Sequence, residues 1–332
     1  MPDPHRRQTS RASQDSARWV QTTWPDGVTA RGAADPPPVG FPCSSDQECP
    51  NGRCVAQRCL ANLSGAIGQN WTHLVGGGGS ILLYDRQSGA GLSGTLDERG
   101  FIPVARYPDF APNYAMAVGT ARGSVLLLRN LWIYAQGALG ATGFLRDGHW
   151  FFTSSYTDFG DWTHAVAAGD SVLLYNADDG TAATGTLIDG QWSYLHLYPD
   201  IGKDFTHLVG TEDSVLLYAF AERRAQAGTL IDGVWTPTTS YEDIGNGPHV
   251  MEFHPSLGAG SSLLLISWSG LTGVTGQLVN GAWQWQHAYP GFNFWRSIAH
   301  AGNGFLLFYD DFHELLAWGT LRNGVWEYYG LT

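Results

Sequence analysis

The sequence predicts an all-β fold, a six-bladed β-propeller in which each blade contains four strands. Three observations predict it. A block of sequence recurs six times at spacings of 43 to 48 residues, within the range of propeller blades. Tight turns containing glycine recur inside the blocks, and the last block is as apolar as the others, which favours a closed ring over an open stack. The blocks begin at Trp71, Tyr114, Trp162, Phe205, His249 and Trp295.

Every block predicts the same series of elements. An aromatic opener precedes a serine and an aliphatic run, as in residues 80–84 and 171–175, and Gly-Thr-Leu or a close variant, a turn and a large aromatic residue follow. The aliphatic runs are continuous, as expected for strands that are covered on both faces. Neighbouring blades of a propeller provide that cover.

The turn in five of the six blocks is an Asn-Gly or Asp-Gly pair between apolar runs. Such pairs favour two-residue hairpins, because both central positions need a positive φ. The first block has Glu98-Arg99-Gly100 instead, so we expect a wider loop there. The five pairs are Asp147-Gly148, Asp189-Gly190, Asp232-Gly233, Asn280-Gly281 and Asn323-Gly324.

A large aromatic residue follows each turn. We expect these rings to fill the space between neighbouring blades, since each ring buries roughly 150–250 Å². The alternative is that they stack on a ligand. The six residues are Phe101, Trp150, Trp192, Trp235, Trp283 and Trp326.

The end of the repeat indicates how the ring closes. Four blocks end in a Tyr-x-Asp corner, with the tyrosines at 107, 156, 198 and 241, whereas in the sixth block Thr332 stands where that tyrosine would fall. Ile67 precedes Trp71 by the same four residues that separate Ile201 from Phe205. We therefore expect residues 61–70 to cover the joint between the last blade and the first.

Three domains are predicted: a flexible arm with a Pro-rich linker (1–42), a Cys-rich segment (43–60) and the propeller (61–332). The arm lacks apolar periodicity and ends in Pro36-Pro37-Pro38, which is typical of a disordered stretch and a stiff extended linker. We expect no independent fold for it.

The four cysteines of the chain are Cys43, Cys49, Cys54 and Cys59. An even number in so short a segment favours two disulfides, with three possible connectivities. A zinc site and free thiols are the alternatives, and the spacing lacks the close Cys-x2-Cys pair that is usual for zinc. Disulfides imply an oxidising compartment. Residues 1–30 contain no apolar signal-peptide core, so we expect that the numbering begins after processing or that the start lies elsewhere.

The Cys-rich segment resembles short Cys-rich stretches of secreted myxobacterial proteins. Lys203 is the single lysine beside 17 arginines, a bias typical of high-GC bacterial genomes. We expect a secreted bacterial protein that acts outside the cell or at its surface.

Composition excludes several classes of function. The 43 glycines, the 14 tryptophans and a charged fraction of 14% fit a β protein dense in turns. No apolar run approaches the roughly 20 residues of a membrane-spanning helix. The net charge of −12 opposes binding to nucleic acid and to anionic lipid.

Catalytic and cofactor motifs are missing from the sequence. His313-Glu314 lacks the second histidine of a zinc-protease motif, and the glycines at 76–79 lack the Gly-Lys-Ser/Thr of a phosphate loop, so we take them as a long hairpin tip. No cofactor is implied. Asp178 and Asp179, with Asn176, form the one clustered acidic loop, which we interpret as a solvated turn, with a calcium ligand or a sugar contact as alternatives.

The block openers are the candidate binding residues. They pair an aromatic residue with a histidine two positions later, on the same face of a strand. One interpretation is a histidine that makes a fixed bond between blades. Another is a pocket at each blade junction in which the ring stacks on a sugar and the histidine bonds its hydroxyls, and a metal held by several histidines is a third. The pairs are Trp71 with His73, Trp162 with His164, and Phe205 with His207.

The repeat of Trp-Thr-His, Ser-Val-Leu-Leu-Tyr and Asp-Gly-x-Trp resembles the lectin propellers of the tachylectin and tectonin kind over residues 71–331. The resemblance implies recognition of carbohydrates, often acetylated amino sugars or bacterial surface glycans, at several equivalent sites. We therefore expect a multivalent glycan-binding propeller. An extracellular scaffold or assembly subunit that binds protein, or itself, through the propeller rim and the arm is the alternative, and a propeller glycosidase or lyase is the third.

Overall fold

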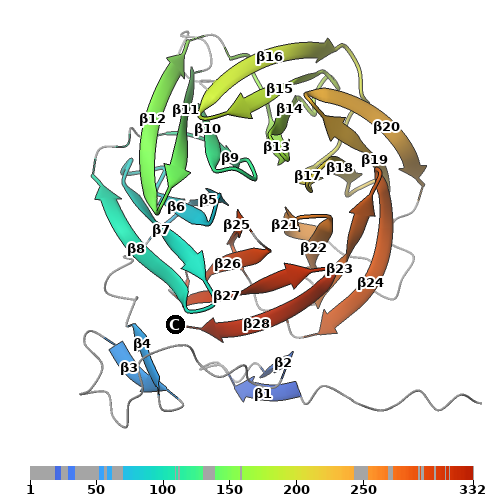
Figure 1. Cartoon of the computed structure of the whole chain (residues 1–332). Helices are drawn as coiled ribbons and strands as arrows, with labels where there is room; N and C mark the ends of the chain where they lie inside the picture. Colours follow the sequence, from blue (N-terminus) through green and yellow to red (C-terminus); the bar gives the residue numbers. More distant parts are fainter. Residues whose placement is uncertain are drawn as a thin grey trace, which may run out of the picture.

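The structure is a computed structural model. It describes the following residues: 19–23, 29–33, 52–55, 58–61, 70–108, 110, 113–129, 139–157, 159–242, 253–267, 272–290, 292, 295–302, 304–310, 312–313 and 315–331. The predicted six-bladed propeller is confirmed. Six antiparallel sheets of four consecutive strands stand in a ring, and the described residues include no helix (Figure 1).

The blades follow one another in chain order, and we number them 1 to 6. Blades 1 to 3 consist of β5 (His73–Gly77), β6 (Ser80–Tyr84), β7 (Gly91–Asp97) and β8 (Gly100–Tyr107); β9 (Met116–Gly119), β10 (Ser124–Arg129), β11 (Leu139–Arg146) and β12 (His149–Tyr156); and β13 (His164–Ala168), β14 (Ser171–Tyr175), β15 (Ala182–Ile188) and β16 (Gln191–Tyr198). Blades 4 to 6 consist of β17 (His207–Gly210), β18 (Ser214–Ala219), β19 (Arg224–Ile231) and β20 (Val234–Tyr241); β21 (Phe253–Ala259), β22 (Ser262–Ser267), β23 (Thr272–Val279) and β24 (Ala282–Pro290); and β25 (Ser297–Gly302), β26 (Phe305–Asp310), β27 (Leu315–Arg322) and β28 (Val325–Leu331).

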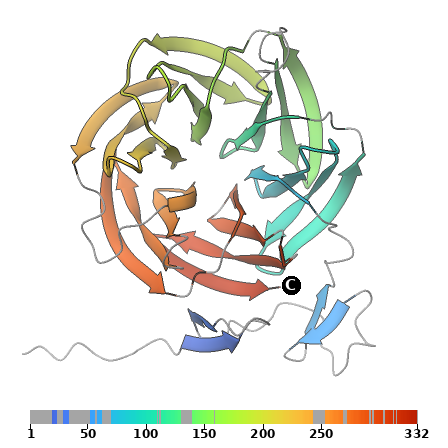
Figure 2. The same ribbon diagram turned by 180° about the vertical axis from the view of Figure 1, so that it is seen from behind.

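In every blade the first strand lies nearest the centre of the ring and the fourth forms the outer edge (Figures 1 and 2). The second strands are buried along their whole length in blades 1, 3 and 4, as the continuous aliphatic runs predict. Each sheet consists of one unbroken stretch of chain. The ring therefore closes by contact between blades 6 and 1, and among the described strands the two blades exchange none.

Six apolar clusters lie at the six blade junctions. Each cluster combines residues of two neighbouring blades, and each contains or touches one aromatic residue that follows a turn. Phe101, Trp235 and Trp326 are buried there, at 2%, 4% and 8% exposure. The predicted packing role of these rings is confirmed.

The Asn-Gly and Asp-Gly turns are two-residue hairpins with positive φ at both positions, for example 49° at Asp232 and 73° at Gly233. They also join blades. The amide of Gly233 donates to Oγ of Ser171 in the preceding blade (2.9 Å), and the same serine-to-glycine bond recurs at four other joints. The serine at the start of the second strand thus fixes the hairpin of the next blade at these five joints.

Two predictions about turns were wrong. The turn at Glu98-Arg99 is no wider than the others, because Asp97 pairs with Gly100 across a two-residue loop. Positive φ falls at Gly100 (106°) instead of at the loop residues. The glycines at 76–79 do not form a long tip, since Gly77 pairs with Ser80. A Cβ on Gly77 would lie 1.9 Å from the carbonyl oxygen of Thr120, so glycine is required where β5 meets blade 2.

The joint between blades 6 and 1 differs from the other five. Phe305 occupies the position of the bonding serine, and Trp318 occupies a position that holds serine, threonine or alanine elsewhere. Nε1 of Trp318 donates to the carbonyl oxygen of Glu98 in blade 1 (3.3 Å), and its ring covers Gly100. An apolar contact thus replaces the serine bond. Residues 62–69, expected at this joint, lie outside the described residues.

Two separate hairpins precede the propeller in sequence. Strands β1 (Trp19–Thr23) and β2 (Thr29–Ala33) pair within the arm, where the sequence analysis expected no strand. Strands β3 (Gly52–Val55) and β4 (Arg58–Ala61) pair so that Cys54 stands opposite Cys59. Cys43 and Cys49 lie outside the described residues. The two disulfides remain a prediction.

Candidate functional site

The opener histidines tie neighbouring blades together. Nε2 of His73 donates to the carbonyl oxygen of Ala115 in blade 2 (3.0 Å), and Nδ1 contacts Oγ1 of Thr72 (2.9 Å). His164 repeats the arrangement towards Thr206 of blade 4, at 3.1 Å. A carbonyl oxygen only accepts, so Nε2 carries the proton and the neutral ring accepts at Nδ1.

Burial suits this neutral form. It lowers the pKa of His73 and of His164 below the usual value, because the charged imidazolium loses its hydration, while the bond to the backbone carbonyl opposes the shift. At neutral pH both rings are therefore uncharged. These are the fixed interblade bonds that the first interpretation of the openers predicts.

The opener rings are packed in the blade junctions. Trp71 is 5% exposed and Phe205 2% exposed, and both belong to apolar clusters. Trp162 is partly buried, and its indole N–H donates to the carbonyl oxygen of Phe159. His207 contacts Oγ1 of Thr206 at 2.7 Å, as His73 contacts Thr72. A sugar would reach Trp71 or Phe205 only if the ring left the core, so their predicted ligand role receives no support from this geometry.

A cavity of about 730 Å³ lies at the centre of the ring, within the size range of ligand pockets. The innermost strands and the turns that follow them line it, mostly with glycine, alanine, valine and leucine. Its described polar or charged side chains are those of Thr211, Glu212, Ser261, Ser262, His300, Arg322 and Asn323.

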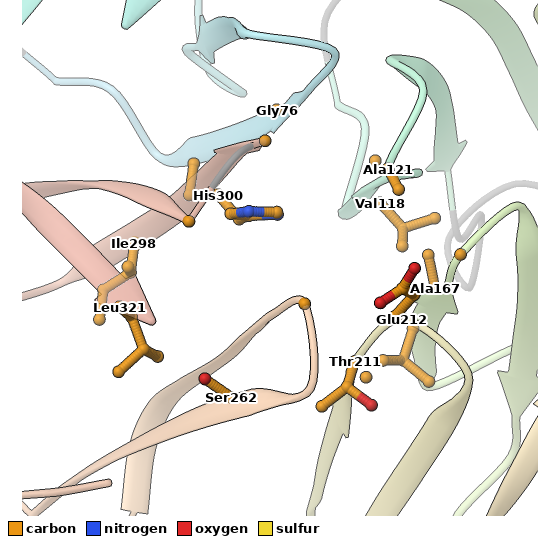
Figure 3. A pocket seen from close by; sticks show the side chains of 18 of the residues that line it. Gly76, Val118, Ala121, Ala167, Thr211, Glu212, Ser262, Ile298, His300 and Leu321 are labelled. Carbon is orange, nitrogen blue, oxygen red and sulfur yellow. The ribbon is translucent and has the colours of Figure 1, made fainter. Parts of the chain in front are cut away.

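Two ionisable residues in the cavity interrupt the repeat. His300 pairs with the second residue of the second strand, as do Gly76, Gly119, Ala167, Gly210 and Gly258 in the other blades. Glu212 occupies a turn position that is glycine in blades 1, 3 and 5. Both side chains extend into the cavity, from opposite walls (Figure 3). Two opposite walls of the cavity thus carry a polar side chain at positions where most other blades have glycine or alanine.

Backbone contacts fix both residues. The amide of Glu212 donates to the carbonyl oxygen of Gly260 (2.8 Å), which anchors the turn to blade 5. A Cβ on Gly76 would lie 2.6 Å from the carbonyl oxygen of His300, so β25 lies tightly against β5. Nε2 of His300 is buried and has no hydrogen-bond partner within the described part of the chain. Burial lowers the pKa of His300 to about 4.

A second repeated feature lies on the outer strands. Phe152, Tyr194 and Trp285 occupy the same position in blades 2, 3 and 5, two residues after the buried or half-buried tryptophan. They are 62%, 55% and 60% exposed. Each stands opposite a glycine on the third strand, as does Tyr328 of blade 6, which is partly buried. Blades 1 and 4 have proline there, a residue suited to exposed edge strands.

The acidic loop is a solvated turn, as predicted. Oδ1 of Asp179 accepts from the amide (2.8 Å) and the hydroxyl (2.6 Å) of Thr181, and these bonds lower the pKa of the carboxyl group. Oδ1 of Asn176 accepts from the amide of Asp178 (3.0 Å). Across the described ranges, no group of three or more His, Cys, Asp or Glu side chains is placed to hold a metal ion.

The sequence analysis missed both the cavity residues and the outer rings. The signal was present in the repeat itself. Aligning the blocks position by position, and not only at their openers, sets His300 and Glu212 against glycine or alanine. It also places Phe152, Tyr194 and Trp285 in one column. Exposure could not be deduced in this way, because Tyr328 of blade 6 occupies the same column opposite Gly319 and is nevertheless partly buried.

No family model matches the chain, and no relative was found among curated proteins. The fold resembles a functionally unknown protein from Desulfotomaculum acetoxidans, with 11% identity, a TM-score of 0.51, and coverage of 79% of this chain and 86% of that one. The periplasmic gluconolactonase PpgL of Pseudomonas aeruginosa has 11% identity, a TM-score of 0.48, and coverage of 80% and 86%. At such identities the likeness concerns the fold alone. Among the described residues no helix is present that could span a membrane.

Proposed function

We propose that this propeller is a secreted, multivalent glycan-binding protein whose binding surfaces are the outer strands. One observation carries the proposal: equivalent positions of three blades expose a large aromatic ring. An exposed apolar ring is unfavourable in water, and its uncovered face is available to a ligand. Sugar rings present flat apolar faces of matching size. The binding surface thus moves from the openers, as first expected, to the outer edge.

Multivalency follows from the repeat. Stacking on a single ring gives weak binding, but three rings held at fixed spacing on one rigid body bind a repetitive polysaccharide with a much higher avidity. The Cys-rich segment supports secretion of the protein, because disulfides form in oxidising compartments and Cys54 stands opposite Cys59 in the hairpin register. The proposal requires no cofactor and no catalytic step.

The test is a glycan array that includes bacterial polysaccharides, probed with the full chain and with variants Phe152→Ala, Tyr194→Ala and Trp285→Ala, singly and combined. We expect each single variant to weaken binding about tenfold and the triple variant to abolish it, since avidity depends on simultaneous contacts. Phe312→Ala removes a ring that is 84% exposed but outside the shared position, and it is the matched control.

Three outcomes would overturn the proposal. A blank array would favour a protein-binding scaffold that uses the same rings. Equal loss in the Phe312→Ala control would show that exposure, and not position, determines binding. Cleavage of a bound glycan, detected as released reducing ends, would indicate a propeller glycosidase or lyase in place of a lectin.

A further inference from the structure

The central cavity contains features that glycan binding on the outer strands does not use. Five blades present glycine or alanine at the position of His300, so the ring geometry itself does not require an imidazole there. Nε2 of His300 is buried without a hydrogen-bond partner in the described part of the chain. Buried polar groups nearly always have a partner. Because this nitrogen is buried, a group that arrives in the cavity would supply a partner only when the imidazole turns towards it.

The charged side chains that line the cavity indicate which class of ligand it can bind. Two residues with charged side chains line it, Glu212 and Arg322. The guanidinium of Arg322 lies over the ring of Phe305, with its Cζ 5.5 Å from the ring centroid. Glu212 directs its carboxylate into the cavity (Figure 3). His300 is neutral, so the charged groups of the lining are the Glu212 carboxylate, which faces the cavity, and the Arg322 guanidinium, which is held over Phe305, in a chain of net charge −12.

The rest of the wall is apolar. Val118 and Ala167 lie on the side of Glu212 and Ile298 lies on the side of His300, and none of the three side chains offers a hydrogen bond (Figure 3). A molecule that fits this surface has an apolar body and one cationic end. A carboxylate ligand would be repelled by Glu212, and a fully polar ligand would leave its hydrogen bonds unmade against the apolar wall.

We propose that the central cavity binds a small organic amine, with the ammonium group paired to the Glu212 carboxylate and the apolar body along the wall towards His300. Neutral His300 then accepts or donates a hydrogen bond at the far end of the ligand. This site is independent of the outer aromatic rings, and its failure would leave the glycan proposal standing.

The test is titration calorimetry of the full chain with three six-carbon probes: hexylamine, hexanol and hexanoate at pH 7.5. We expect hexylamine to bind at least tenfold more tightly than hexanol, and hexanoate to give no heat of binding. Glu212→Gln keeps the shape and removes the charge, and it should weaken hexylamine binding at least tenfold while leaving hexanol unchanged. Glu222→Gln, in the exposed turn before β19 of the same blade, is the matched control and should change nothing.

His300→Ala tests the other wall. Ala167 holds the equivalent position in blade 3, so the strand tolerates the change. We expect weaker binding of 6-aminohexan-1-ol, whose terminal hydroxyl can bond the imidazole, in a variant that keeps wild-type glycan binding, and we expect this ligand to shift the ring resonances of His300 in the wild type. Absence of binding by every probe, equal binding of hexanoate, or an undiminished affinity in Glu212→Gln would each overturn the proposal.

Discussion

His73 and His164 show what a single residue does in this ring. Each imidazole binds a carbonyl oxygen of the next blade with one nitrogen and a threonine hydroxyl of its own blade with the other. Both rings are neutral, because burial lowers the pKa. His300 is buried as well, yet its Nε2 has no partner within the described residues. Histidine thus forms bonds between blades at positions 73 and 164, whereas at position 300 its Nε2 has no partner among the described residues.

Stability should therefore fall in mild acid. The pKa of His300 is about 4 in the folded chain against an ordinary 6.5, so between these values the unfolded chain binds more protons than the folded one. The contribution is fully present above about pH 6.5 and is lost as the pH falls towards 4, amounting to roughly 2–3 kcal/mol. Denaturant unfolding at pH 7.5 and pH 4.5 measures it. His300→Ala should show a smaller loss than wild type, and identical losses in the two proteins would contradict the assignment.

At the scale of elements, one small contact recurs at each regular joint. A serine that opens the second strand accepts the amide of the glycine in the next blade's hairpin, and a tyrosine hydroxyl accepts the amide of the aromatic residue that follows it, as Tyr198 does for Trp235 (2.9 Å). The hairpin is thereby fixed on both sides. Register between blades depends on these bonds as well as on apolar packing.

Ser171→Ala should destabilise the chain by about 1–3 kcal/mol, because the amide of Gly233 would be buried without a partner. Ser171 is 4% exposed, so water cannot replace the hydroxyl without opening the joint. Ser155→Ala, at an exposed position of β12, should change the free energy of unfolding by less than about 0.5 kcal/mol. Equal effects of the two variants in chemical denaturation would show that the interblade bond adds little.

At the scale of the whole molecule, the ring closes at the joint between blades 6 and 1, which departs from the repeat. The joint between blades 6 and 1 lacks the serine bond in its described residues, and Trp318 packs instead on Gly100 and bonds the carbonyl oxygen of Glu98. Blade 1 has no Asp-Gly hairpin where this indole lies. The two deviations of the repeat therefore meet at one contact.

Trp318→Thr gives blade 6 a residue that other blades carry, yet it should cost about 3–5 kcal/mol, because a ring that is 3% exposed is removed from a packed joint. The loss should also appear as faster hydrogen exchange in β27 and β7, on the two sides of the joint. Trp285→Ala removes an exposed indole and should change stability by less than about 1 kcal/mol. A similar cost in both variants would contradict the role of Trp318 in closure.

The sequence by itself determined the number of blades, the four strands of each, the Asn-Gly and Asp-Gly hairpins and the packing of Trp235 and its equivalents. These depend on local chemistry: positive φ at a turn residue, and continuous apolar runs in doubly covered strands. Only the tertiary structure decided which aromatic rings are accessible. Trp71 and Trp285 look alike in sequence, yet one is packed between blades and the other is 60% exposed on the outer strand of blade 5. Accessibility is set by side chains of other strands and blades, as is the meeting of Glu212 and His300 across the cavity, and no local pattern contains that information.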